Sequence, residues 1–523
     1  MRHVTCRPAL TAPAVILLLA AAPTAMAADL GGIPMKAPPV AASSWTGVYA
    51  GLGLGFRSTR TDLTTTSVVL DGVPIGLSQF VLTQPFDGVG FRANPYAGTN
   101  WQVAPHWVVG LEGDVGFGDQ STRLSGARGS PVFTSSTFAA DGFSVKTTWD
   151  ASLRARAGYL LTPATLVYAT GGVAWQHVDV NLVCVSGACA FSGRSPNLIS
   201  QSATRTGWTL GGGIETALWG NWLLRGEYRY ADFGAAPFSF TSTRTGGAAV
   251  TVDNFDVKLR THTASVGLAY RFGEPVLGSR ANPLSAQAAI LPSWTGAYAG
   301  LGLGARATRT DLVSTSETAG LRSRDLADRA NVRPMDNTAA RISLHAGYLW
   351  QIAAQWAAGV EGDVGFADRT TTREGFTSIF LGDSQSPGEG LSVRSRWDAS
   401  LRARLGHLVT PQTLLYVTGG AAWQNLELTS TCTNSVCSNV FGLSPAIVSA
   451  SRTATGWTLG GGVETALWGN WLARAEYRYA DYGTQHFTVG RSSTEPTLNP
   501  AVNTYDLTQR AHLATFGVSY RFQ

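Results

Sequence analysis

Two matching sets of charged side chains mark this chain of 523 residues, and each set balances four carboxylates against four arginines. An arginine and a carboxylate can form two parallel hydrogen bonds, and a charge that leaves bulk water must be paired or hydrated. We therefore expect a plug of salt bridges; a gate or narrow ion path and a catalytic carboxylate pair are the alternatives. The two sets are Glu112, Asp114, Arg154, Arg156, Glu215, Arg225, Glu227 and Arg229, followed by Glu361, Asp363, Arg402, Arg404, Glu464, Arg474, Glu476 and Arg478.

Histidines could supply ligands for haem or a metal, and the chain has eight of them. Only His262 and His512 recur in register with the two charged sets. A haem site needs a stable axial ligand in an apolar pocket, and the sequence indicates no such pocket. Ser265 follows His262, but Thr515 stands at the equivalent place after His512, so no Ser, His and acid constellation is duplicated. The sequence thus predicts no cofactor, no metal site and no enzymatic activity.

Cysteines form two close pairs, Cys184 with Cys189 and Cys432 with Cys437, each with four residues between. In an oxidising compartment such pairs form local disulfides, each stabilising the fold by about 2 kcal/mol. A metal site is the alternative, but it needs further His or Cys ligands, and only His177 lies near the first pair. We predict two disulfides.

Strands must position these groups, because apolar and polar residues alternate along the chain. Trp208, Leu210 and Ile214 share one parity of their segment, whereas Thr209 and Glu215 share the other. A period of two is typical of a half-buried strand. The polar parity carries full charges and glycines, and the apolar parity ends in aromatics, which is the pattern of a membrane barrel with a polar interior. The charged sets are therefore expected to face the lumen.

The candidate strands of the first copy are joined by connections that alternate between short and long. Those strands are roughly 45–58, 90–101, 107–118, 148–160, 166–180, 204–217, 222–232 and 261–272. The long connections are about 59–89, 119–147, 181–203 and 233–260. Short periplasmic turns and long outer loops are the rule in outer-membrane barrels. We expect an aromatic belt near the short turns, formed by Trp45, Trp101, Trp107 and Trp222.

Tryptophan spacing indicates that the chain contains the same unit twice. The sixteen tryptophans form eight pairs separated by 248 or 249 residues, and WDASLRAR occurs at 149–156 and again at 397–404. This period is too long for a solenoid, so each copy is expected to be a whole domain. Eight strands enclose an interior that side chains just fill, without a channel.

The connection at 273–293 bears on the number of barrels, because it has 21 residues and three prolines. Neighbouring strands of a single wall need only a short turn. We predict an all-β fold of two tandem eight-stranded antiparallel transmembrane β-barrels; one sixteen-stranded porin-like barrel is the alternative. The expected parts are a signal peptide (1–27), a periplasmic Pro/Ala-rich leader (28–44), barrel 1 (45–272), a periplasmic linker (273–293) and barrel 2 (294–523).

The amino terminus and the composition indicate the destination. Arg2 and Arg7 precede an apolar run at 14–22 and the small-residue site Ala25-Met26-Ala27, as in a secretory signal peptide. A Gly-rich chain with 14% charged residues fits the outer membrane of a Gram-negative bacterium. Removing the two arginines takes 39 basic residues to 37 against 34 acidic ones, a net charge of +3 that does not suggest nucleic acid.

The motifs GLEGDVGF (110–117), LVYATGGVAWQ (166–176) and EYRYADFG (227–234) carry a family resemblance. The chain resembles the small outer-membrane β-barrel surface antigens of alpha-proteobacteria, the "porin family" barrels, whose structural relatives are OmpX and the OmpA transmembrane domain. The resemblance implies an eight-stranded barrel and a major surface antigen, and some members are reported as haem binders. This chain departs from the pattern in its tandem duplication and in ending with Phe522-Gln523 instead of Phe.

These observations predict a non-enzymatic outer-membrane protein that supports envelope integrity and displays variable loops at the surface. A porin that forms a diffusion channel is one alternative, and capture of haem or a host surface by the loops is another. The expected partners are outer-membrane lipid, lipopolysaccharide and the barrel assembly machinery, and no nucleic acid is expected.

Overall fold

The computed structural model describes residues 44–76, 83–125, 142–184, 197–243, 250–274, 293–319, 322–325, 333–374, 377–378, 382–383, 389–432, 446–491 and 501–522. The predicted signal peptide, all but the last residue of the leader and most of the 273–293 linker lie outside these residues. So do Cys189, Cys437 and the side chains of Cys184 and Cys432, and the two disulfides therefore stay predictions.

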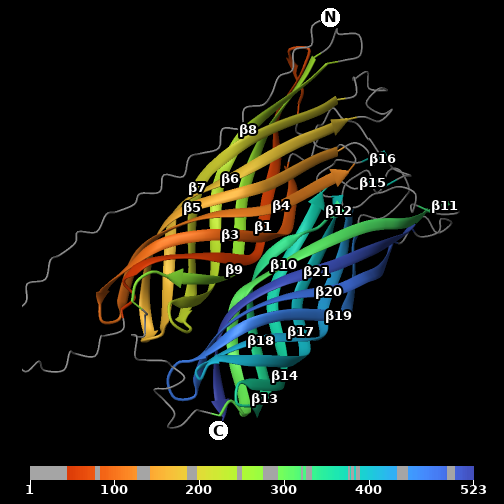
Figure 1. Cartoon of the computed structure of the whole chain (residues 1–523). Helices are drawn as coiled ribbons and strands as arrows, with labels where there is room; N and C mark the ends of the chain where they lie inside the picture. The colour runs from red at the N-terminus through yellow and green to blue at the C-terminus, as the bar shows by residue number, and fades with distance from the viewer. Residues whose placement is uncertain are drawn as a thin grey trace, which may run out of the picture. The chain divides into compact units, whose positions relative to one another are not determined.

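Barrel 1 is one antiparallel sheet that closes on itself, and its strands run side by side from red to green in Figure 1. Neighbours in sequence are neighbours in the sheet, and the last strand pairs with the first from Tyr49 opposite Arg271 onward. A two-residue strand, β2 (Val73–Pro74), pairs antiparallel with the last residues of β1. The eight long strands are β1 (Gly47–Leu70), β3 (Thr83–Ala104), β4 (Trp107–Ser125), β5 (Gly142–Thr162), β6 (Thr165–Cys184), β7 (Asn197–Ala217), β8 (Trp222–Thr243) and β9 (Val250–Arg271).

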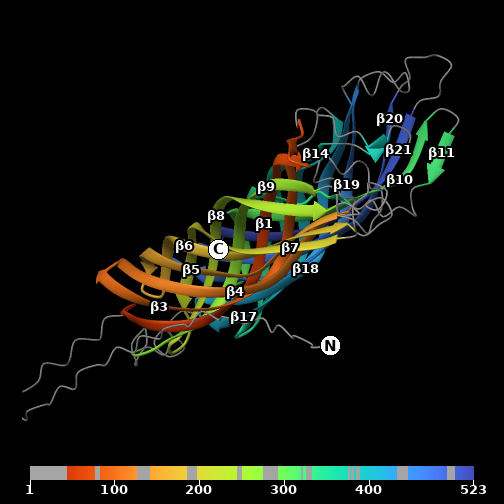
Figure 2. The ribbon, with the colours of Figure 1, turned by 90° about the horizontal axis from the view of Figure 1, so that it is seen from above.

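Barrel 2 repeats this topology, coloured green to blue in Figures 1 and 2. Its first and last strands pair, so each copy forms its own closed barrel. The two-barrel prediction is confirmed, and the single sixteen-stranded barrel is wrong. The long strands are β10 (Gly296–Ala319), β13 (Asn337–Ala353), β14 (Trp356–Glu374), β17 (Glu389–Thr410), β18 (Thr413–Cys432), β19 (Ala446–Ala466), β20 (Trp471–Arg491) and β21 (Ala501–Phe522); β11 (Arg322–Asp325), β12 (Arg333–Pro334), β15 (Thr377–Ser378) and β16 (Gly382–Asp383) are short.

Alternation decides which side chains face outward, and β1 shows it clearly. Leu52 and Leu54 are 65% and 58% exposed on the outer wall. Gly51 lies between Ala50 and Leu52 on the lumen side, where a Cβ atom would stand 2.6 Å from Cζ of Tyr96. Glycine is therefore needed here because a bulky ring from the neighbouring strand crosses the backbone.

The strands continue far beyond the predicted ends, and the long connections are correspondingly shorter. The sequence predicts a connection at 233–260, but β8 runs to Thr243 and β9 starts at Val250. Strands also extend into the other three predicted long connections. The strand pattern persists with inverted polarity: Val178 and Val180 are buried inside barrel 1, whereas Asp179 between them is not. Reading a Ser- and Thr-rich stretch as a loop was wrong.

A β-bulge changes which alternate residues of a strand face the lumen, and β5 contains one. On β5 the register shifts between Thr147 and Trp149 against β4, and between Thr147 and Asp150 against β6. Ser152 and Asp150 face the lumen below this point, and Thr147 and Val145 are buried above it. One extra residue in a strand re-aims the side chains that follow. The bulge thus joins the charged part of the lumen to an apolar part.

Candidate functional site: the filled lumen

Glu112 of β4 is the centre of the ion-pair network in barrel 1. Arg154 donates to its carboxylate at 2.5 Å and Tyr49 Oη donates at 2.7 Å. Arg225, from the opposite side of the barrel, contacts both oxygens, and Arg156 lies 3.5 Å away. All five side chains are buried, so three guanidinium groups surround one desolvated carboxylate.

Two further carboxylates complete the layer around Glu112. Glu227 accepts from Arg154 at 2.9 Å and from Tyr168 Oη at 2.7 Å. Glu215 accepts from Arg156 at 3.1 Å, and that guanidinium lies 3.9 Å from the centroid of the Tyr168 ring. Aromatic faces and carboxylates together hold each arginine, and such contacts are strongest where water is excluded.

A second layer of charges lies closer to the ends with long connections. Asp114 accepts from Arg229 at 2.8 Å and from Arg92 at 2.6 Å. Asp150 accepts from Arg57 at 2.6 Å and from Arg92 at 2.9 Å. Arg92 therefore bridges two carboxylates that come from neighbouring strands. These contacts link the charges of five strands into one network across the lumen.

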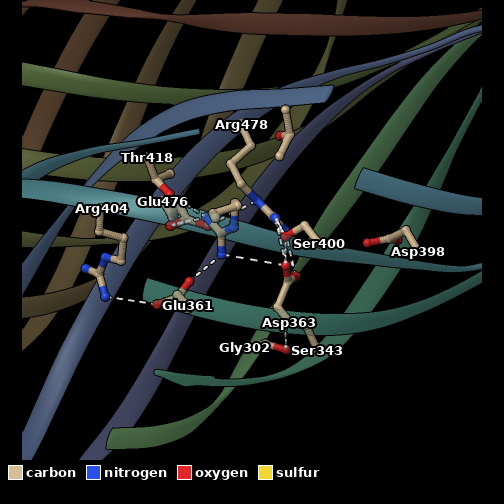
Figure 3. A network of polar contacts seen from close by, with 12 residues as sticks. Gly302, Ser343, Glu361, Asp363, Asp398, Ser400, Arg404, Thr418, Glu476 and Arg478 are labelled. Carbon is tan, nitrogen blue, oxygen red and sulfur yellow. Dashed lines mark hydrogen bonds and ion pairs between the residues drawn. The ribbon is translucent and has the colours of Figure 1, made fainter. Parts of the chain in front are cut away.

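Barrel 2 builds the same network, shown in Figure 3 with Arg404 aimed at Glu361 and Arg478 at Asp363. Glu361 accepts from Arg404 at 2.9 Å and from Arg474 at 2.6 Å. Asp363 accepts from Arg478 at 2.7 Å. Glu464, at 3.0 Å from Arg404, holds the place of Glu215.

The structure places all sixteen charged residues picked out by parity in these two networks, and it adds three more to each. Asp150 shares a parity with Arg154 and Arg156, and Arg57 shares one with Gly55, so the same alternation could have found them. Each network then comprises six arginines and five carboxylates among the described residues. The added residues are Arg57, Arg92 and Asp150 in barrel 1 and Arg306, Arg341 and Asp398 in barrel 2.

Trp45 closes barrel 1 at the end with the short turns, and its predicted place in the aromatic belt is wrong. Its side chain is fully buried, its indole N–H donates to the carbonyl of Pro163 at 3.1 Å, and its backbone N–H donates to Gln102 Oε1 at 3.0 Å. It therefore lies inside the lumen and not in the aromatic belt, whereas Trp101 and Trp107 are 44% and 52% exposed. Trp45 precedes the first paired residue of β1, so the alternation of that strand does not predict the direction of its side chain. We call the buried cluster around Trp45 the floor.

Trp294 forms the floor of barrel 2 through the same contacts. Its indole N–H donates to the carbonyl of Pro411 at 3.1 Å, and its backbone N–H donates to Gln351 Oε1 at 3.0 Å. The two copies thus keep the buried tryptophan and both of its hydrogen bonds.

An apolar cluster fills the lumen at the opposite end, and we call it the roof. In barrel 1 the rings of Phe143 and Phe255 meet edge to face with centroids 5.5 Å apart, and Phe240 packs beside both. Leu63 and Val180 belong to the same buried cluster. The lumen therefore has three layers: an apolar roof, an ion-pair network and a tryptophan floor.

The duplicated histidines have ordinary partners. Tyr228 Oη lies 2.7 Å from Nδ1 of His262, and Tyr477 Oη lies 2.7 Å from Nδ1 of His512. Within the described ranges, no group of three or more His, Cys, Asp or Glu side chains could hold a metal ion. The described part of the chain also contains no helix long and apolar enough to cross a membrane.

Comparisons with known proteins agree with this architecture. The family model described as "Outer membrane protein beta-barrel domain" matches residues 14–272 and again 279–522. The 31 kDa outer-membrane immunogenic protein of Brucella melitensis is 32% identical over 260 residues, which cover 48% of this chain and 95% of that protein. The 25 kDa outer-membrane immunogenic protein of Brucella abortus is 32% identical over 262 residues, covering 49% and 94%.

Among solved structures, the attachment invasion locus protein Ail of Yersinia pestis aligns with 44% of this chain and 99% of its own length. The sequence identity is 17% and the TM-score is 0.21, so this likeness adds nothing to the argument. The family match spans both copies and most of the chain. The chain therefore belongs to the family of outer membrane protein beta-barrel domains, which it carries twice in tandem in the outer membrane.

Proposed function

We propose that both barrels are closed, non-enzymatic anchors that strengthen the outer membrane and display the outer ends of their strands and loops at the cell surface. The observation that carries this proposal is the ion-pair network centred on Glu112 in barrel 1 and on Glu361 in barrel 2. Each network crosses its lumen between an apolar roof and a tryptophan floor.

The energetics of the network argue against a diffusion channel. An ion entering the lumen would have to displace arginines from carboxylates that are shielded from water, and removing one partner of such a buried pair costs roughly 3–5 kcal/mol. An interior of eight strands has little room beyond its own side chains. A path through barrel 1 would also require the Phe143 and Trp45 layers to move.

Surface display is supported by the length of the strands and by the relatives. A membrane crossing uses about 9–11 residues of a tilted strand, whereas β8 has 22 residues. The extra length carries polar residues outward and would stand above the lipid headgroups. The two Brucella relatives are named immunogenic outer-membrane proteins. For this chain we propose contact with outer-membrane lipid and lipopolysaccharide, insertion by the barrel assembly machinery, and loops that meet host or haem ligands.

Single-channel recording in planar bilayers tests the closed lumen. The refolded chain from residue 28 to 523 is expected to give no uniform conductance steps. The control is a variant with Arg154→Ala and Arg402→Ala, which removes one arginine from each network and should admit water and produce unstable current bursts. Stable, uniform channels from the unaltered protein would replace the anchor proposal with a porin.

A further inference from the structure

Barrel 1 contains a small cavity between its ion-pair network and its roof, lined by both polar and apolar side chains. The volume in which the centre of a water molecule can lie is about 20 Å³. Its apolar lining consists of Ala151, Ala174, Trp175, Ala231 and Phe233. The polar lining consists of Asp150, Ser152, Thr209, Arg229, Thr261 and Thr263.

The second copy keeps the charged residues around this position but has different side chains where the cavity lies in barrel 1. Thr261 corresponds to Ala511, and Thr263 corresponds to Leu513. Leu513 is buried in a continuous apolar cluster that also contains Tyr482, the equivalent of Phe233. In barrel 1 the corresponding apolar residues are divided between two clusters, with Phe233 apart from the roof. Barrel 2 thus fills with a leucine the place where barrel 1 has a threonine.

The size and the chemistry of the cavity select its occupant. One water molecule needs roughly 10–15 Å³ measured in this way and two to four polar partners. A threonine hydroxyl can donate one hydrogen bond and accept others, and an ionised carboxylate only accepts. The hydroxyl of Thr209 already donates to the carbonyl of Tyr230 at 2.9 Å, which leaves its oxygen free to accept. Water can donate to Thr209 and Asp150 and accept from Thr261 or Thr263.

We infer that barrel 1 binds one ordered water molecule in this cavity and that barrel 2 has lost the site through Leu513. The two lumens therefore differ in hydration although they carry the same charges. Water reaches the Asp150 and Arg229 side of the network in barrel 1, and an apolar side chain excludes it in barrel 2. A bound water can shift with its partners, so this layer of barrel 1 is the more adaptable of the two.

Nuclear magnetic resonance of the full-length chain in detergent micelles, with ¹³C-labelled threonine and leucine methyl groups, detects such a water directly. Magnetisation transfer from water to the methyl groups of Thr261 and Thr263 is expected, and none is expected to Leu513. The matched variant, Thr261→Ala with Thr263→Leu, copies barrel 2, and the methyl groups of the leucine introduced at position 263 should receive no transfer while the protein remains folded. Equal transfer to Leu513, or none to either threonine, would overturn the assignment.

A stability measurement distinguishes a hydrated cavity from an empty one by its sign. Thr263→Val keeps the shape of the side chain and removes its hydroxyl. If water is bound, its lost partner should lower the unfolding temperature of barrel 1 by about 2–4 °C. If the cavity is empty, removing a buried hydroxyl should raise that temperature, and the inference fails.

Discussion

Glu112 shows how a single carboxylate can link opposite walls of a lumen, because two arginines of the neighbouring strand and one of a distant strand contact it. Arg225 is the one that comes from the far wall. Replacing Arg225 with Met leaves Glu112 buried with two of its three cations. We expect a loss of roughly 3–5 kcal/mol in the free energy of unfolding, because the carboxylate is buried away from water.

The measurement is the urea midpoint at which the folded, faster-migrating band disappears in gels of unheated samples. Arg474→Met is the equivalent change in barrel 2 and should have a similar effect. An exposed ion pair supplies the control: Arg394 contacts Asp368 on the outer surface, and Arg394→Met should leave the midpoint unchanged. An equal response to the exposed and buried variants would show that the lumen network contributes little.

Trp45 is the residue on which the floor of barrel 1 depends, since its ring is buried and its indole N–H has a partner. Trp45→Ala should lower the free energy of unfolding by roughly 3–5 kcal/mol, as for other large-to-small changes in a core. Trp101→Ala, in the exposed aromatic belt, is the matched control and should have a smaller effect on the same midpoint. The opposite order would return Trp45 to the belt that the sequence suggested.

At the scale of strands, the two barrels differ in one wall of the lumen. Tyr96 of β3 lies 3.6 Å from Arg225, ring centroid to guanidinium carbon, and Ala269 of β9 is nearby in the floor cluster. The equivalent residues of barrel 2 are His345 and Ser519, whose Nε2 and Oγ atoms lie 2.8 Å apart. The large tyrosine ring beside an alanine in barrel 1 is thus replaced in barrel 2 by a smaller imidazole ring that is hydrogen-bonded to a serine hydroxyl.

These two positions should be coupled. His345→Tyr alone would crowd Ser519, and Ser519→Ala alone would leave the buried imidazole without its partner. The double variant recreates the arrangement of barrel 1 and should be more stable than the sum of the two single effects by about 1 kcal/mol. A double-mutant cycle on the unfolding midpoint of barrel 2 measures this coupling, and strict additivity would refute it.

The position of the membrane along each strand gives another prediction. Leu153 points outward in the middle of β5 and is 59% exposed on the wall, so Leu153→Arg should cost about 2–4 kcal/mol. Thr204 also points outward on β7, four residues before Trp208. We expect this position to stand above the lipid, so Thr204→Arg should be tolerated. Folding efficiency into lipid vesicles compares the two. Equal penalties would mean that the lipid reaches farther up the strands than the aromatic residues indicate.

Alternation along the strands made most of the lumen predictable, and its failures have physical causes. Glu215 and Arg225 could be assigned to the lumen because lipid on one face demands apolar residues at every second position. Beyond the membrane that demand ends, so the outer half of β6 or β8 reads like a polar loop although it remains paired. The partner of each arginine depends on the shear of the barrel, which no single strand reveals.

At the scale of the molecule, each barrel is complete without the other. The floor, the network and the roof of barrel 1 all come from residues 45–271, and β9 pairs with β1 to remove every open edge. Barrel 2 repeats these parts between residues 294 and 522. A closed sheet has no unpaired strand that would need a neighbour to satisfy its backbone.

We therefore expect residues 28–273, expressed without the second copy, to fold into a membrane-inserted barrel. The expected readout is a species whose gel mobility changes on heating and whose outer strands resist protease at the concentration that cuts the unfolded chain. Residues 274–523, expressed behind the same signal peptide, are the reciprocal half and should behave alike, because the charge set, floor and closing strand pair recur there. If neither half folds unless both are present, contacts between the copies must supply stability that the lumen of each barrel lacks.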